Sequence, residues 1–115
     1  MMRFSAPTPE LPVRDVRAAQ AHYRDRLGFD IAWYNDEGCI GAVSRDDWVV
    51  FLRGTNGPIV PQVCWLFVED VDAAADDLAS RGADIVDPVS DKPWGLRQFT
   101  VSDLAGHLFH VFCDL

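Results

Sequence analysis

The chain has 115 residues, a formal net charge of −8 at pH 7 and 49% hydrophobic residues. This length suffices for one domain with a single core. The negative charge argues against nucleic acid as a partner, because phosphate backbones would be repelled. No stretch has the roughly 20 apolar residues of a membrane span, and residues 1–7 lack the apolar run of a secretory signal. We therefore expect a cytoplasmic protein with no membrane partner.

One nine-residue pattern occurs twice along the chain. The pattern L-x-V-x-D-V-x-A-A stands at residues 11–19 and again at residues 66–74, an offset of 55 (Asp70 minus Asp15). In each copy an alternating stretch ends at an aspartate and a helical pattern follows. Asp15 and Asp70 are expected N-caps, because their carboxylates can accept hydrogen bonds from the free N–H groups of the first turn. The repeat predicts two modules of one design.

The helical patterns each have one apolar face and a glycine stop. The first face consists of Val16, Ala19, Tyr23 and Leu27, with Gln20 beside them, and the second consists of Val71, Ala74, Ala75 and Leu78. Gly28 and Gly82 are expected to end the two helices. Predicted strands follow at residues 29–34, 39–44 and 48–53 in the first half, and at 83–86, 96–102 and 107–113 in the second.

Each half therefore reads β-α-β-β-β, and a four-stranded sheet with one helix leaves one face bare. We expect the bare faces of two such sheets to come together as a curved, mixed-sheet half-barrel with a central cleft, which is an α+β fold. Module one is expected over about residues 5–53 and module two over about 62–115. The Gly- and Pro-rich residues 54–61 form the predicted linker.

The repeat, the run Tyr23-x-Asp25-x-Leu27-Gly28-Phe29 and the hairpin W-G-x-R-x-F-x-V-x-D-x-x-G at residues 94–106 resemble the vicinal-oxygen-chelate superfamily. That superfamily includes glyoxalase I, extradiol dioxygenases, fosfomycin-resistance enzymes and bleomycin-resistance proteins. The resemblance covers nearly the whole chain and implies a single domain over residues 1–115. It implies a fold rather than one function.

In the enzymes of this superfamily, three positions that hold a divalent metal match Thr8, Val63 and His110 here. Valine cannot ligate a metal, and threonine is a poor substitute for imidazole or carboxylate. We therefore expect no metal site, no cofactor and no catalytic residue. The alternative is a metal-dependent glyoxalase-like lyase or dioxygenase with a shifted ligand register, for which Glu10 and His22 are the spare candidates.

Three local motifs resemble the bleomycin-resistance branch: Asp-Arg-Leu-Gly-Phe at 25–29, Gly-Ala-Val-Ser-Arg-Asp-Asp at 41–47 and Pro-Trp-Gly at 93–95. The resemblance implies a homodimer that encloses a bulky, cationic glycopeptide antibiotic, or a similar aromatic cation, and makes or breaks no bond. The N-terminal strand, residues 6–13, is the expected element of exchange between protomers, since its three prolines confine it to a sheet edge.

The cleft aromatics of the family match Trp33, Trp65 and Trp94, and strand alternation places Phe67 with Trp65. His110 stands in the last strand where the enzymes carry Glu. Asp47 is expected to join Asp36, Glu37 and Asp46 in an acidic cluster at the cleft rim. The predicted ligand-binding set is therefore Trp33, Trp65, Phe67, Trp94, His110 and Asp47.

Other roles stay open for these residues. Each aromatic residue could pack in the core, and His110 could be a core histidine, a cleft residue or a catalytic or metal-binding group. His107, which follows the turn glycine, is expected to be exposed. Two departures from the family, Ala32 where an acid is expected and Arg53 where a small polar residue is expected, weaken the case for bleomycin itself. They leave room for a third hypothesis, a binder of another small molecule.

Overall fold

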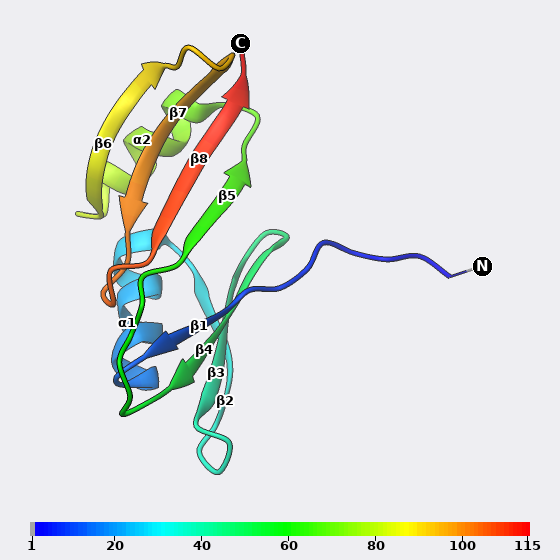
Figure 1. Cartoon of the computed structure of the whole chain (residues 1–115), viewed down its shortest axis with the longest axis vertical. Helices are drawn as coiled ribbons and strands as arrows, with labels where there is room; N and C mark the ends of the chain where they lie inside the picture. Colours follow the sequence, from blue (N-terminus) through cyan, green and yellow to red (C-terminus); the bar gives the residue numbers. More distant parts are fainter. Residues whose placement is uncertain (1) are drawn as a thin grey trace.

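The computed structural model describes residues 2–115, in which one element order occurs twice (Figure 1). The first module contains β1 (Glu10–Val13), α1 (Val16–Leu27), β2 (Asp30–Asn35), β3 (Ile40–Arg45) and β4 (Trp48–Gly54). The second contains β5 (Val63–Phe67), α2 (Val71–Ser80), β6 (Asp84–Asp91), β7 (Leu96–Ser102) and β8 (Leu108–Asp114). The strand orders are β1-β4-β3-β2 and β5-β8-β7-β6, each with one parallel pair. The predicted α+β fold of two βαβββ modules is confirmed.

The helix starts follow the predicted caps. Asp15 accepts a hydrogen bond from the amide of Ala18, and Asp70 accepts one from Ala73, each at 3.0 Å. The predicted face of α1 is buried along its whole length, including Gln20. Gly28 ends α1 with φ of 73°, a left-handed conformation that favours glycine. Neither helix within residues 2–115 is long and apolar enough to cross a membrane.

Strand β6 is twice as long as the four residues predicted, because it continues through Pro88 to Asp91. A proline lacks the N–H that a central strand needs, but β6 is the edge strand of its sheet. The pairing of β6 with β7 also shifts register on either side of Asp87. The edge position and these irregularities explain why the strand predicted from the sequence ended at residue 86, whereas β6 continues to Asp91.

The two modules share one core on the sides of the sheets that carry the helices. Phe109 of β8 is fully buried, and its ring lies 5.0 Å from that of Trp48 and 6.3 Å from that of Tyr23, both in the first module. Arg45 also reaches Asp77 of α2 at 2.8 Å. Burial would raise the pKa of Asp77, but hydrogen bonds from Arg81 and Arg45 outweigh it and lower that pKa. The modules are therefore joined through their helix-side faces.

The opposite faces of the two sheets, here called the open faces, stay uncovered in a single chain. The sheets do not close on one another, and large side chains on both open faces are about half exposed. Trp33 represents the first open face and Trp65 the second. The chain alone thus supplies the two halves of the expected cleft without bringing them together.

His107 corrects a prediction, because it is completely buried rather than exposed. Its backbone amide donates to Asp103 across the hairpin turn at 2.9 Å, which folds the imidazole inward. The ring Nδ1 accepts from the amide of Gln62, so the Nε2–H donates to the carbonyl of Pro12 at 2.7 Å. The ring joins Gln62, just before β5, to β1, a tertiary role that the turn sequence does not reveal.

Tyr23 and Asp103 form a buried hydrogen bond of 2.7 Å between the modules. Burial, together with the neighbouring Asp103 carboxylate, raises the pKa of Tyr23 well above its usual value. Tyr23→Phe is expected to lower the free energy of unfolding at pH 7 by about 1–3 kcal/mol, because Asp103 loses a buried donor. Urea titrations of the variant and of Tyr34→Phe, whose hydroxyl bonds Asp36 at an exposed turn, provide the measurement.

Ionisation of the Tyr23 side chain is expected to lower the free energy of unfolding at alkaline pH. A raised folded-state pKa means that the stabilisation is complete below about pH 10, the unfolded value, and is lost as pH rises through the folded value. Tyr23→Phe should show a smaller loss between pH 9 and 11 than the unaltered chain. An equal alkaline loss in both proteins would contradict this assignment.

Candidate functional site

An aromatic cluster lies on the open face of the second sheet. Strand alternation in β5 turns Trp65 and Phe67 away from α2, and parallel pairing places them opposite His110 and Phe112 of β8. The Trp65 ring lies 4.5 Å from the His110 ring and 5.9 Å from Phe112, and the Phe67 ring lies 5.8 Å from Phe112. Trp65 and Phe67 remain 54% and 55% exposed. Three predicted site residues therefore form one continuous surface.

Two buried polar side chains of β7 support this surface. Gln98 accepts a hydrogen bond from the indole N–H of Trp94 at 3.0 Å, and the Thr100 hydroxyl lies 2.7 Å from Nδ1 of His110. Trp94, at the loop before β7, is largely exposed. Sequence reasoning missed Gln98 and Thr100. The signal available was their polarity at positions that alternate with the buried residues Phe99 and Val101.

Trp33 lies on the open face of the first sheet, apart from the aromatic cluster. It pairs with Ala42, which pairs in turn with Phe51, and the rings of Trp33 and Phe51 lie 5.3 Å apart. On the same face Arg53 donates to Glu10 at 2.9 Å. This pair neutralises both charges, so Arg53 presents no free cation there.

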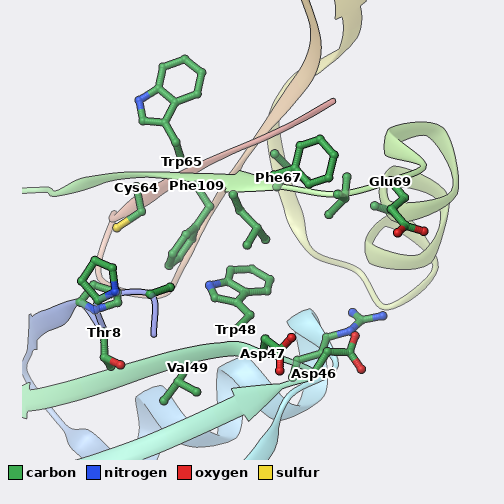
Figure 2. Close-up of a pocket in the computed structure, with 18 of the residues that line it drawn as sticks. Thr8, Asp46, Asp47, Trp48, Val49, Cys64, Trp65, Phe67, Glu69 and Phe109 are labelled. Atoms are coloured by element: carbon green, nitrogen blue, oxygen red, sulfur yellow. The ribbon is translucent and has the colours of Figure 1, made fainter. Parts of the chain in front are cut away.

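A cavity of about 810 Å³ lies between β5 and the turn that joins β3 to β4 (Figure 2). Trp48, Cys64, Leu66 and Phe109 line its apolar part. Figure 2 shows the Trp65 indole on the far side of β5, pointing away from the cavity. Burial raises the pKa of the Cys64 thiol, which disfavours the thiolate that a nucleophile would need.

Three acidic side chains line this cavity: Asp46, Asp47 and Glu69. Among the described residues, none forms an ion pair with these carboxylates. The nearby cation, Arg45, is already bound to Asp77 and to the carbonyl of Leu27. Asp47 therefore keeps a free carboxylate. Trp65 and Phe67 line the same cavity as Asp47, although the Trp65 indole points to the other side of β5 (Figure 2).

The prediction that four acidic residues cluster at the cleft rim is wrong. Asp36 and Glu37 lie in the turn before β3, whereas Asp46 and Asp47 lie in the turn after it. The six residues of β3 separate the two turns by roughly 20 Å at about 3.3 Å per residue. Turns that are close in sequence stand at opposite ends of the strand.

The three positions that match the metal ligands of the superfamily's enzymes do not suit a divalent metal here. Val63 offers no donor and Thr8 offers only a hydroxyl, so His110 is the one imidazole among the three positions. The spare candidates do not complete a set, since Glu10 is bound to Arg53 and His22 lies on α1 with its pKa lowered by burial. Within residues 2–115 no group of three or more His, Cys, Asp or Glu side chains is placed to hold a metal ion.

Comparison with models of known protein families identifies one superfamily. The model of the Glyoxalase/Bleomycin resistance protein/Dioxygenase superfamily matches residues 6–111. No match was found among curated proteins.

Several solved structures share the fold over nearly their full length. TioX from Micromonospora sp. ML1 is 30% identical with a TM-score of 0.81, over 97% of this chain and 100% of that one. The bleomycin-binding protein of bleomycin-producing Streptomyces verticillus, complexed with copper(II)-bleomycin, is 27% identical with a TM-score of 0.77, over 96% and 97%. A bleomycin resistance determinant encoded on the transposon Tn5 is 22% identical with a TM-score of 0.84, over 96% and 98%.

Proposed function

The chain belongs to the glyoxalase/bleomycin resistance protein/dioxygenase superfamily, and we propose that it is a metal-free binding protein that sequesters a bulky, planar aromatic cation of the bleomycin class. The observation that carries the proposal is the aromatic cluster of Trp65, Phe67, Phe112 and His110, in which Trp65 and Phe67 are half exposed. Large contiguous apolar surfaces on a folded chain mark binding sites. The similarity to bleomycin-binding proteins supports this class of ligand.

Aromatic faces and a negative field suit such a ligand in two ways. A planar heteroaromatic group can stack on Trp65, and a cationic group can lie over a ring with about 0.5–2 kcal/mol of attraction. The net charge of −8 and the free carboxylates of Asp46, Asp47 and Glu69 attract a cation from solution. In this proposal the protein is not an enzyme, and it acts in the cytoplasm as one domain over residues 1–115.

The proposed active form is a homodimer, because each cleft needs two open faces and one chain leaves both uncovered. The second sheet of one protomer, with Trp65, would face the first sheet of its partner, with Trp33. Exposed apolar faces of this kind are typical of subunit interfaces. Trp94, at the edge of the second open face, would border the cleft.

The N-terminal arm, residues 2–9, is the proposed element of exchange. It contains no helix or strand, and its N-terminal end extends away from the rest of the chain (Figure 1), whereas residues 6–9 line the cavity between the modules. Phe4 on this arm is 86% exposed, although aromatic residues are rarely left in water without a partner. Only Glu10–Val13 of the predicted exchanging strand pairs with β4 of the same chain.

Phe4→Ser is expected to weaken the dimer by roughly ten- to hundredfold, the effect of removing one buried Phe side chain. Sedimentation equilibrium over a range of protein concentrations measures the dissociation constant. Leu104→Ser, at an exposed turn, is the control and should leave the constant unchanged. A monomeric unaltered chain would contradict the dimer, and an unchanged constant for Phe4→Ser would contradict the arm.

Titration with bleomycin tests the function directly. Intrinsic tryptophan fluorescence should be quenched by metal-free and copper-loaded bleomycin at sub-micromolar concentration, with about one ligand per protomer. No response at high micromolar ligand would exclude bleomycin. Elemental analysis of the purified protein tests the enzyme alternative, since a stoichiometric transition metal would contradict a metal-free binder.

A second candidate is a binder of a different planar antibiotic. The observation that favours it is the Glu10–Arg53 pair, which removes a free acid from the first open face. Ala32, also exposed, offers no acid either. Under this alternative, planar aromatic compounds without a polycationic tail would quench the tryptophans more strongly than bleomycin does.

A further inference from the structure

Two polar side chains lie beneath the aromatic surface of the second sheet, where apolar packing would be expected. Gln98 and Thr100 are 3% and 4% exposed, and both face the open side of β7. Each makes its side-chain hydrogen bond to an aromatic residue that lies on that surface, Trp94 or His110. A buried polar group that bonds only to a surface ring fixes the orientation of that ring.

The orientation of the Thr100 hydroxyl follows from its surroundings. Asp87 pairs with Thr100 across β6 and β7, but its carboxylate is bound to Lys92 at 2.8 Å. Within residues 2–115, Nδ1 of His110 is the one side-chain hydrogen-bond partner of the Thr100 hydroxyl. A buried hydroxyl hydrogen needs an acceptor, and no other acceptor pairs with this hydroxyl among the described residues, which favours donation from Thr100 to Nδ1 over the reverse. A neutral imidazole that accepts at Nδ1 carries its proton on Nε2.

The Nε2–H of His110 is then available to a ligand. It has no partner among the described residues, and it is not a buried unpartnered atom. The His110 ring packs beside Trp65 at 4.5 Å with an angle of 44° between the planes. The two rings are therefore neighbours on the open face, so one planar ligand can contact both.

We propose that Thr100 is a positioning residue that holds His110 in the Nε2–H tautomer, so that His110 recognises an acceptor on the edge of a planar ligand stacked on Trp65. The inference rests on the proposed function and narrows its ligand class. The ligand would carry a ring nitrogen, carbonyl or other acceptor at the edge of its aromatic system. Gln98 orients the Trp94 indole in the same way, by accepting its N–H.

The closing experiment reads the tautomer in the protein without any ligand. Nitrogen-15 NMR of the histidine side chains at pH 8, where a free imidazole is neutral, should show His110 as one Nε2–H tautomer. Thr100→Val should give a mixture of tautomers, Thr100→Ser should restore the single form, and Thr55→Val in the linker should change nothing. A mixture in the unaltered chain, or a single Nε2–H form in Thr100→Val, would overturn the proposal.

Binding of metal-free bleomycin provides the second arm. Thr100→Val should raise its dissociation constant about three- to tenfold, the effect of one hydrogen bond, and Thr100→Ser should reverse most of that loss. Equal affinity of Thr100→Val and the unaltered chain would overturn the recognition role. If bleomycin does not bind the unaltered chain, the proposed ligand fails, while the NMR result still decides whether Thr100 positions His110.

Discussion

Phe109→Ala is expected to lower the free energy of unfolding by about 3–5 kcal/mol, the usual cost of truncating a fully buried phenylalanine. The ring is completely buried and packs against Trp48 and Tyr23, so the substitution leaves a cavity where the two modules meet. That cavity would adjoin the existing one between the modules, which Phe109 also lines. Most domains have only 5–15 kcal/mol of stability, so the variant should lose a large part of it.

Phe112→Ala is the matched control, because it lies on the same strand, three residues further along, but on the open face. Its side chain is partly exposed, and we expect a loss of no more than about 1 kcal/mol. Urea unfolding followed by circular dichroism and by tryptophan fluorescence measures both variants. Similar losses for the two variants would contradict the shared core, and separate transitions for the two signals would show that the modules unfold independently.

The repeat unit could be predicted from the sequence because its determinants are local. Asp15 and Asp70 cap helices through the amides of residues three positions ahead, and the faces of α1 follow from its period. The same locality explains why Trp65 and Phe67 were placed on one face of β5. Strand alternation needs no knowledge of the rest of the fold.

The errors arise where distant segments decide the outcome. His107 is buried because Gln62 and Pro12 provide its two hydrogen-bond partners, which are 45 and 95 residues away in sequence. The acidic cluster failed because a strand between two turns keeps them apart. Gln98 and Thr100 were missed because their importance depends on which rings lie above them in the sheet.

Trp65→Ala is expected to weaken bleomycin binding by tenfold or more. Removing the indole eliminates a stacking surface and a cation–π partner, which together contribute about 1–3 kcal/mol. Because the side chain is half exposed, the fold should be unaffected. Isothermal titration calorimetry measures the affinity, with Trp65→Phe as a graded control that keeps part of the stacking surface. Unchanged affinity of Trp65→Ala would remove the aromatic cluster from the site.

Trp33→Ala extends this prediction to the composite cleft, since Trp33 lies on the other sheet. If each cleft takes Trp33 from one protomer and Trp65 from its partner, both single variants should lose affinity. A mixed dimer of one Trp33→Ala chain and one Trp65→Ala chain would then contain one cleft with both substitutions and one with neither. Its expected signature is one site of unaltered affinity per dimer. If one chain instead supplied both residues to each cleft, both sites of the mixed dimer would be weak.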